Sequence, residues 1–487
     1  MALKEKTLSG VSWTATARVV QQLIRFGVIV LLTRLLTPEA FGLIGMIIVI
    51  TGFVELFSDA GFGAALIQKK NIEERHLSSI FWINVLIGTF LTLIVGASAS
   101  LVADFYGEPA LVNLTRFIAL QFFIGSLNTV QQSLLQRKMN FKKLTIVQIS
   151  TQVISGGIAV GMALTGFGVW SLAWQSLITV GSNSVLLWVL SPWRPKWIYD
   201  GKAVKDLLKF SSNLLGFKII NYWSRSADDL LIGRFVGSAG LGIYTRAYST
   251  MLLPISQVTN VLQQVMFPAL SKIQDDIQRV KRIYLQANRI IALISMPMMC
   301  GLFVVAEPFV ISVFGSQWEE VVPVLQILCF VGIKQPMGST SGWIFQSQNK
   351  TDVQFKWNIV VSIVTILAFV IGLKWGVIGV AAAYAIRSYI VWYPAITIVG
   401  NIIDMTFTEF ITNVAGVFFY SITMAVIVYG VGLVIPSTWT LFSVLVIQVL
   451  TGIITYLGLI HFGRLKAYKE AKRLLFESIE NLKDDKS

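Results

Sequence analysis

The side chains most able to do chemistry in this sequence are charged residues that lie inside long apolar stretches. Eight of them are basic, namely Arg18, Arg25, Arg116, Lys218, Arg225, Arg246, Lys334 and Arg387. Four are acidic, namely Glu55, Asp59, Asp228 and Asp229. A charge at the centre of a membrane costs about 2.5–3.5 kcal/mol on insertion scales. We therefore expect these groups to line a watery cavity or to pair with one another.

Spacing predicts which of these charges share a helix face. Arg18 and Arg25 are seven residues apart, which is two helical turns, so both point to the same side. Lys218 and Arg225 repeat this spacing later in the chain. The sequence therefore predicts two helices that each carry a cationic stripe.

Ion pairing is one interpretation of the membrane charges, and anion binding is the other. The candidate pairs are Arg25 with Glu55 or Asp59, and Arg225 with Asp228 or Asp229. Eight bases cannot all be neutralised by four acids, so a cationic cavity that binds an anion is expected. Arg suits phosphate because its fork of donors matches two phosphate oxygens. Arg116 is expected near a helix end, where it can snorkel, while Lys334 and Arg387 fit either interpretation.

The composition identifies the surroundings of these charges as a membrane. The chain has 487 residues, of which 55% are hydrophobic and only 13% are charged. Soluble proteins carry about 25% charged residues, so an ordinary soluble enzyme is excluded, as is a disordered chain. We predict an all-α polytopic membrane protein with about 14 transmembrane helices. Two Cys and two His give no credible zinc site, and we expect no metal, no cofactor and no enzymatic activity.

The distribution of basic residues predicts the orientation. Of the 39 Lys and Arg residues, 28 fall in segments that are cytoplasmic if the N-terminus is inside, and three fall in outer loops. This asymmetry places both termini in the cytoplasm. The net charge of +14 then faces anionic lipid, so no nucleic-acid partner is needed to explain it.

An internal repeat at an offset of 200 residues predicts the domain organisation. RLLTPEAFGL from Arg34 aligns with RFVGSAGLGI from Arg234 without a gap. Each half holds six spans, so the two lobes enter the membrane in the same direction and enclose a cleft that opens by alternating access. The predicted parts are an N-lobe (1–190), a cytoplasmic linker (191–209), a C-lobe (210–400), two further spans (401–462) and a cytoplasmic amphipathic tail (463–487).

Several glycines fall at the ends of predicted helices. They are Gly42, Gly61, Gly63, Gly237, Gly240 and Gly242. Glycine at such positions allows a turn or a close approach of two helices, and hinge function is the alternative.

Four segments resemble a known family. They are RLLTPEAFG from Arg34, SDAGFGAALIQKK from Ser58, RFVGSAGLGIYTRA from Arg234 and FPALSKI from Phe267. Together they resemble the polysaccharide transporter (Wzx-like, colanic-acid and O-antigen exporter) family of the MATE/MurJ/Wzx flippase superfamily. The resemblance runs through roughly residues 5 to 400.

This resemblance implies a flippase in the bacterial inner membrane. Such proteins translocate undecaprenyl-pyrophosphate-linked oligosaccharide units for exopolysaccharide or O-antigen biosynthesis. The implied partners are this anionic lipid-linked oligosaccharide, membrane lipids and the glycan polymerase machinery. By position, the pyrophosphate-binding role of spans one and eight falls on Arg18, Arg25 and Arg246. Lys218 and Arg225 are further candidates for substrate binding, because they form the second cationic stripe. Ion coupling falls on Glu55 and Asp59, with Asp228 and Asp229 as further candidates.

Three alternatives stay open at this point. A MATE-type drug or cation efflux antiporter would need an acid-rich aromatic cavity, which the basic excess disfavours. A peptidoglycan lipid-precursor flippase would use the same pyrophosphate chemistry. A membrane glycosyltransferase or polymerase is expected to bring a sizeable extramembrane segment, and the outer loops here are short. No G-x-x-x-x-G-K-[ST] loop occurs, so ATP is not expected to drive transport.

Overall fold

The computed structural model describes residues 20–58, 62–68, 72–201, 204, 222–223, 226–436, 438–463, 465, 467–470 and 472, with the backbone alone at 64 and 256–265. Four of the predicted site residues therefore lie outside the described residues, namely Arg18, Asp59, Lys218 and Arg225. Gly61, most of the predicted linker beyond residue 201 and most of the predicted tail also lie outside them.

Throughout the described residues, the regular structure is helical and contains no strand. A first helix covers residues 20–35. The following helices in the first half are α2 (Pro38–Ser58), α3 (Phe62–Gln68), α4 (Glu74–Ala97), α5 (Ala99–Tyr106), α6 (Leu111–Ser126), α7 (Thr129–Arg137), α8 (Phe141–Leu164) and α9 (Val169–Leu190). A further helix covers residues 226–235.

The second half continues in the same way. Its helices are α11 (Ser238–Ser271), α12 (Ile277–Val304), α13 (Ala306–Val313), η1 (Ser316–Trp318), α14 (Val321–Ser339), α15 (Ser341–Ser347), α16 (Thr351–Gly372), η2 (Leu373–Trp375), α17 (Gly376–Ile403), α18 (Phe407–Val434) and α19 (Leu441–Phe462).

Many of these helices are long and apolar enough to cross a membrane. In the described ranges there are nine such stretches, or ten if α6 and α7, which meet at a bend of 44°, form one span. One of the nine, Thr351–Ile403, contains α16 and α17 in succession. The prediction of an all-α polytopic membrane protein is confirmed. The predicted spans one and seven extend into residues that the structure does not describe.

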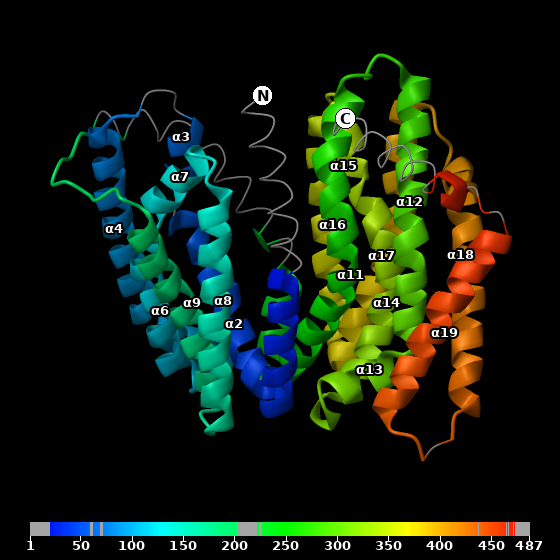
Figure 1. Cartoon of the computed structure of the whole chain (residues 1–487), viewed down its shortest axis with the longest axis horizontal. Helices are drawn as coiled ribbons and strands as arrows, with labels where there is room; N and C mark the ends of the chain where they lie inside the picture. Colours follow the sequence, from blue (N-terminus) through cyan, green and yellow to red (C-terminus); the bar gives the residue numbers. More distant parts are fainter. Residues whose placement is uncertain are drawn as a thin grey trace, which may run out of the picture. The chain divides into compact units, whose positions relative to one another are not determined.

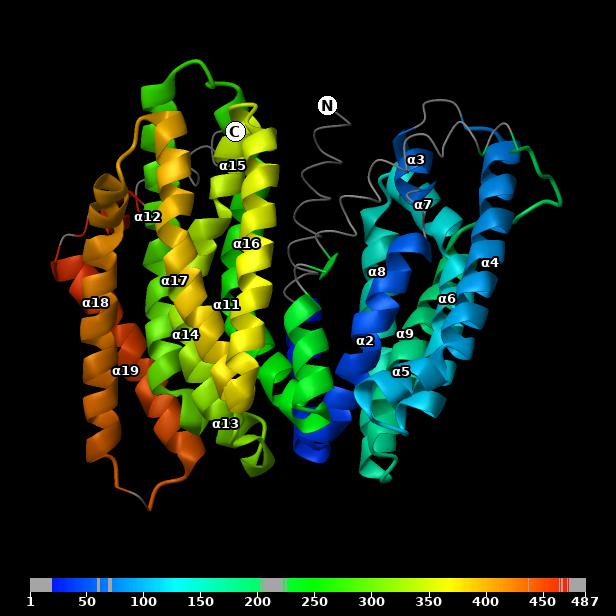
Figure 2. The ribbon, with the colours of Figure 1, turned by 180° about the vertical axis from the view of Figure 1, so that it is seen from behind.

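The chain separates into two compact units, Met1–Gly242 and Ile243–Ser487. In the first unit, α4 packs along α6, α8 packs along α9, and α6 contacts α9 (Figure 2). The boundary between the units falls inside α11, so the described part of the predicted seventh span belongs to the first unit. The division into lobes at residues 190 and 210 stays a prediction.

The two repeated segments meet inside the first unit. A Cβ atom added to Gly42 would lie 1.7 Å from the backbone oxygen of Ser238, and one added to Gly242 would lie 2.0 Å from that of Pro38. Each glycine therefore sits against the first residue of the other helix, α2 or α11. Only glycine permits backbones to approach so closely. The close-approach interpretation is confirmed for this pair.

Residues on both sides of the helix at 226–235 form hydrogen bonds with earlier parts of the first unit. The phenol of Tyr222 donates a hydrogen bond to the backbone oxygen of Val49 (2.6 Å). The hydroxyl of Ser238 donates to a carboxylate oxygen of Glu108 (2.8 Å). These bonds and the glycine contact together explain why the first unit extends to residue 242.

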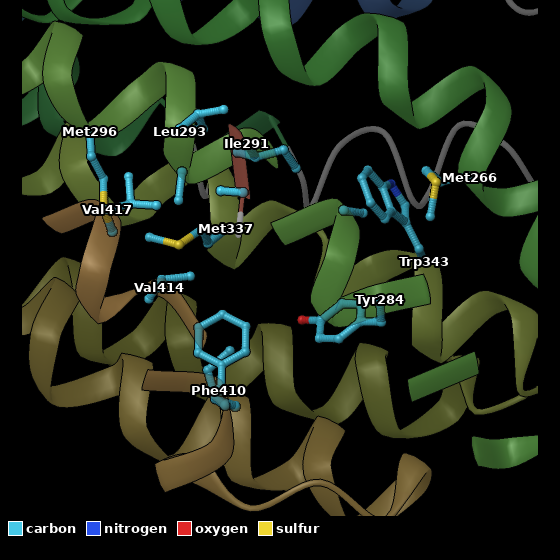
Figure 3. Packing of buried hydrophobic residues seen from close by; sticks show 14 of the residues in the cluster. Met266, Tyr284, Ile291, Leu293, Met296, Met337, Trp343, Phe410, Val414 and Val417 are labelled. Atoms are coloured by element: carbon cyan, nitrogen blue, oxygen red, sulfur yellow. The ribbon is translucent and has the colours of Figure 1, made fainter. Parts of the chain in front are cut away.

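The second unit is a bundle around a large apolar core. The helices α12, α14, α17, α18 and α19 run side by side in this unit (Figure 1). Met296 on α12 and Val414 and Val417 on α18 belong to the buried cluster, with Phe410 near the start of α18 (Figure 3). A capping box begins α18, because Thr406 and Glu409 exchange hydrogen bonds between side chain and backbone.

The beginning of the predicted linker docks on the cytoplasmic end predicted for α4. The indole of Trp82 donates to the backbone oxygen of Lys196 (2.9 Å), and its ring stacks on Trp197 with centroids 4.1 Å apart. The backbone nitrogen of Asp200 donates to the hydroxyl of Ser79 (2.8 Å). Residues 191–200 thus follow the surface of the first unit.

Candidate functional site

Arg25 is exposed on the helix that covers residues 20–35. This helix is tied to α8, since Gln21 donates to the side chain of Gln148 (3.0 Å) and Gln152 donates to the backbone oxygen of Gln21 (3.1 Å). Within the described residues, Arg25 makes no hydrogen bond or ion pair, so the candidate pair with Glu55 is not formed. Its guanidinium is available to a ligand.

Glu55 lines a cavity of about 560 Å³ inside the first unit. Its carboxylate has no hydrogen bond or ion pair with any described residue. The cavity is walled mainly by neutral polar side chains from α2, α6, α7 and α9. The amides are Gln121, Asn128, Gln132, Gln136 and Asn183, and the hydroxyls are Ser58, Ser126, Thr129, Ser133 and Thr179. We call it the polar cavity.

Asp228 and Asp229 lie on the helix at 226–235 and are not among the residues that line the polar cavity. The side chain of Asp228 is buried. Asp229 acts electrostatically on the phenols of Tyr106 and Tyr222, which belong to the same unit. Both phenols thus lie within electrostatic range of Asp229.

Arg246 lies on α11 in the second unit, where it packs on aromatic rings. Its guanidinium carbon is 5.7 Å from the ring centre of Phe314 and 5.5 Å from that of Trp318. Cation–π contacts of this length hold a guanidinium without neutralising its charge. Arg246 therefore stays a candidate for anion binding.

Two further cations of the second unit, Lys334 on α14 and Arg387 on α17, lie within its helical bundle. Only 9% of Lys334 is exposed. Its ammonium is 5.5 Å from the ring centre of Tyr389 and 6.0 Å from that of Trp392, and it makes no hydrogen bond or ion pair with any residue that the structure describes.

Only some of the hydrogen-bond donors of the Arg387 guanidinium have partners in the described part of the chain. One guanidinium nitrogen donates to the backbone oxygen of Val361 (3.0 Å), and the guanidinium lies 5.9 Å from the ring centre of Tyr384. Its Nε atom is buried without a hydrogen-bond partner. The ring of Tyr384 in turn lies 6.3 Å from that of Tyr248 on α11. We call the following residues the cation–aromatic cluster: Lys334, Arg387, Tyr248, Tyr384, Tyr389 and Trp392.

The cluster differs from two other cations of the second unit. Lys281 pairs with Glu409 (2.8 Å), and Arg289 in the middle of α12 pairs with Glu470 (2.7 Å). Lys334 and Arg387 have no carboxylate within ion-pair distance in the described part of the chain. The sequence shows that both residues are charged. It does not show that they lack an ion-pair partner, because pairing depends on contacts between distant segments. An uncompensated cation in an apolar bundle is suited to bind an anion.

Comparison with known proteins identifies the family. A sequence model described as polysaccharide biosynthesis protein (Polysacc_synt_3) matches residues 31–323. The chain belongs to this family. The match confirms the resemblance drawn from the repeated segments.

Curated relatives of this family member span most of its length. It is 28% identical over 482 residues to the teichuronic acid biosynthesis protein TuaB of Bacillus subtilis (strain 168), covering 97% of this chain and 98% of TuaB. It is 28% identical over 453 residues to the lipopolysaccharide biosynthesis protein WzxC of Escherichia coli (strain K12), covering 90% of each. It is 27% identical over 356 residues to the succinoglycan biosynthesis transport protein ExoT of Rhizobium meliloti (strain 1021), covering 73% of this chain and 72% of ExoT.

Solved structures show the same fold. The lipid II flippase MurJ in an inward closed conformation superposes with a TM-score of 0.73 at 17% identity, covering 92% of this chain and 98% of MurJ. An inward-facing multidrug resistance MATE family transporter of the MOP superfamily superposes with a TM-score of 0.61 at 15% identity, covering 78% and 95%. At these identities the likeness concerns the fold alone.

Proposed function

We propose that this protein is a flippase that translocates undecaprenyl-pyrophosphate-linked oligosaccharide units across the bacterial inner membrane for exopolysaccharide or O-antigen biosynthesis. Membership in the polysaccharide biosynthesis protein family supports this function, as do relatives with roles in teichuronic acid, lipopolysaccharide and succinoglycan biosynthesis. The single structural observation that carries it is the buried ammonium of Lys334, which has no ion-pair partner among the described residues and interacts electrostatically with Arg387. A pyrophosphate headgroup or an acidic sugar supplies the anion that these cations lack.

We assign the binding of the pyrophosphate to guanidinium and ammonium groups, namely those of Arg18, Arg25, Lys218, Arg225 and Arg246. Arg25 is exposed and has no partner among the described residues, and Arg246 is held over aromatic rings, which supports the assignment for these two. Alternating access would move the bound headgroup from one side of the membrane to the other.

Transport of this kind breaks no bond in the substrate, so no catalytic residue is assigned. The acids Glu55, Asp59, Asp228 and Asp229 are the candidates for ion coupling. Replacing Glu55 by Gln removes its charge and keeps its shape. If export by this variant no longer depends on the ion gradient, coupling through Glu55 is supported. If the dependence is unchanged, Glu55 is removed from the candidates.

Both termini are assigned to the cytoplasm, where the basic loops face anionic lipid. The glycan polymerase machinery on the opposite side of the membrane would receive the translocated unit.

The experiment that tests the function measures where the lipid-linked oligosaccharide accumulates. Deleting the gene is expected to trap it in the inner leaflet, and wild-type protein should restore export. Lys334→Gln and Arg387→Gln should insert normally and restore less than a tenth of the export, since each removes an uncompensated cation. Export at the wild-type level by both variants would refute the role of the cluster. A deletion that traps no oligosaccharide but raises sensitivity to cationic drugs would favour the MATE-type alternative.

A further inference from the structure

We infer that the polar cavity of the first unit is a subsite for an uncharged, hydroxyl-rich sugar of the transported oligosaccharide. This inference rests on the proposed function and adds a place and a chemical class for part of the substrate. The polar cavity lies wholly in the unit Met1–Gly242, so its geometry does not depend on the second unit.

The short helix α7 presents one polar face to the cavity. Thr129, Gln132, Ser133 and Gln136 are spaced at i, i+3, i+4 and i+7, and all four line it. This spacing defines one face of a helix. Outside this face, Val130 is buried in the cluster that includes residues of α3 and α4, and Gln131 is buried without lining the cavity. Four of the polar side chains of α7 are thus directed at the cavity.

Hydrogen bonds to the neighbouring helix α3 fix this face in place. The hydroxyl of Ser133 donates to the backbone oxygen of Gly63 (3.4 Å), and a guanidinium nitrogen of Arg137 donates to that of Leu66 (3.1 Å). The two helices lie together at the end of the first unit that also carries residues 191–200 (Figure 1). This end is the one predicted to face the cytoplasm, where the substrate enters under the proposed function.

Four cavity amides have no protein partner. The side chains of Gln121, Gln132, Gln136 and Asn183 form no hydrogen bond with any residue in the described part of the chain. Each amide offers two donors and an acceptor. Sugar hydroxyls both donate and accept, so an array of free amides matches them better than it matches an ion or an apolar chain.

The size of the cavity fits a small organic group. About 560 Å³ falls within the range of about 300–1,000 Å³ that small-molecule sites occupy.

The charge of the lining selects against acidic sugars. Glu55 is the one charged residue among the side chains that line the cavity in the described ranges. Its carboxylate can accept hydrogen bonds from two hydroxyls, but it repels a second carboxylate. The ligand class is therefore a neutral sugar, and anionic groups of the substrate are left to the cationic residues.

The test compares two ligands on the full-length protein in nanodiscs. One ligand is lipid-linked oligosaccharide extracted from the host strain, and the other is undecaprenyl pyrophosphate without sugar. Microscale thermophoresis gives Kd for each. The variants are Gln132→Leu/Gln136→Leu and Asn183→Leu, which remove amides from two different helices. Gln346→Leu on α15 is the matched control, because Gln346 is exposed, belongs to the second unit and is not among the residues that line the cavity.

Both cavity variants are expected to bind the oligosaccharide ligand at least tenfold more weakly and the bare pyrophosphate as the wild type does, since each lost hydrogen bond costs several-fold in affinity. The control should bind both ligands normally. An unchanged affinity for the oligosaccharide in both variants would overturn the inference, and so would an equal loss for the two ligands. Wild-type protein that binds neither ligand would instead count against the proposed function itself.

Discussion

The contact between the repeated glycines yields the sharpest prediction. In Gly42→Ala the new Cβ would lie 1.7 Å from the backbone oxygen of Ser238, whereas ordinary contact begins at 3.4 Å. The starts of α2 and α11 would have to separate by roughly 1.7 Å to accept it. Backbone atoms cannot rotate away as a side chain can, so the cost lies at or above the upper end of the 1–3 kcal/mol typical of overpacking.

The measurement is the thermal unfolding of the purified protein in detergent, together with export in the deletion strain. Gly42→Ala and Gly242→Ala are each expected to lower the midpoint by several degrees and to reduce export. The double variant should lose less stability to unfolding than the sum of the losses in the two single variants. Helices that are already pushed apart accept the second methyl group more easily.

Gly96→Ala on α4 is the matched control, because a Cβ there meets no atom within 4 Å. Alanine is the better helix former by about 1 kcal/mol, so this variant should unfold at or slightly above the wild-type temperature. If Gly42→Ala unfolded at the same temperature as Gly96→Ala, the close packing of α2 against α11 would be refuted.

Three other predictions follow from single contacts. Lys334→Met should raise the unfolding midpoint and abolish export, since removing an unpaired membrane cation recovers about 2.5–3.5 kcal/mol; a lower midpoint would contradict the absence of a partner. Arg289→Ala should expose residues 467–472 to limited proteolysis, because it removes the partner of Glu470 at 2.7 Å; an unchanged digestion pattern would show that other contacts hold this segment. Trp82→Ala should speed proteolysis within residues 191–200, because the stack and the hydrogen bond to this segment are lost; the wild-type rate would refute the docking.

Much of the fold follows from local sequence. Hydropathy and helical periodicity act over one helix, so the apolar stretches predict an all-α polytopic protein directly. Four segments of the sequence resemble the family, and glycines at predicted helix ends, Gly42 and Gly242 among them, predict turns or close helix approaches. The sequence also shows that Lys334 and Arg387 lie in apolar surroundings.

Only the tertiary structure decides which distant residues meet. It brings the starts of α2 and α11 together through Gly42 and Gly242, which lie 200 residues apart in the sequence. It gathers the amides of α6, α7 and α9 around one cavity, although no stretch of sequence unites them. Among the described residues it leaves Lys334 without an anion, and a count of charges does not reveal which cation lacks a partner. The physical reason is the same in each case: helix formation depends on neighbours three and four residues away, while cavities and ion pairs depend on how completed helices pack.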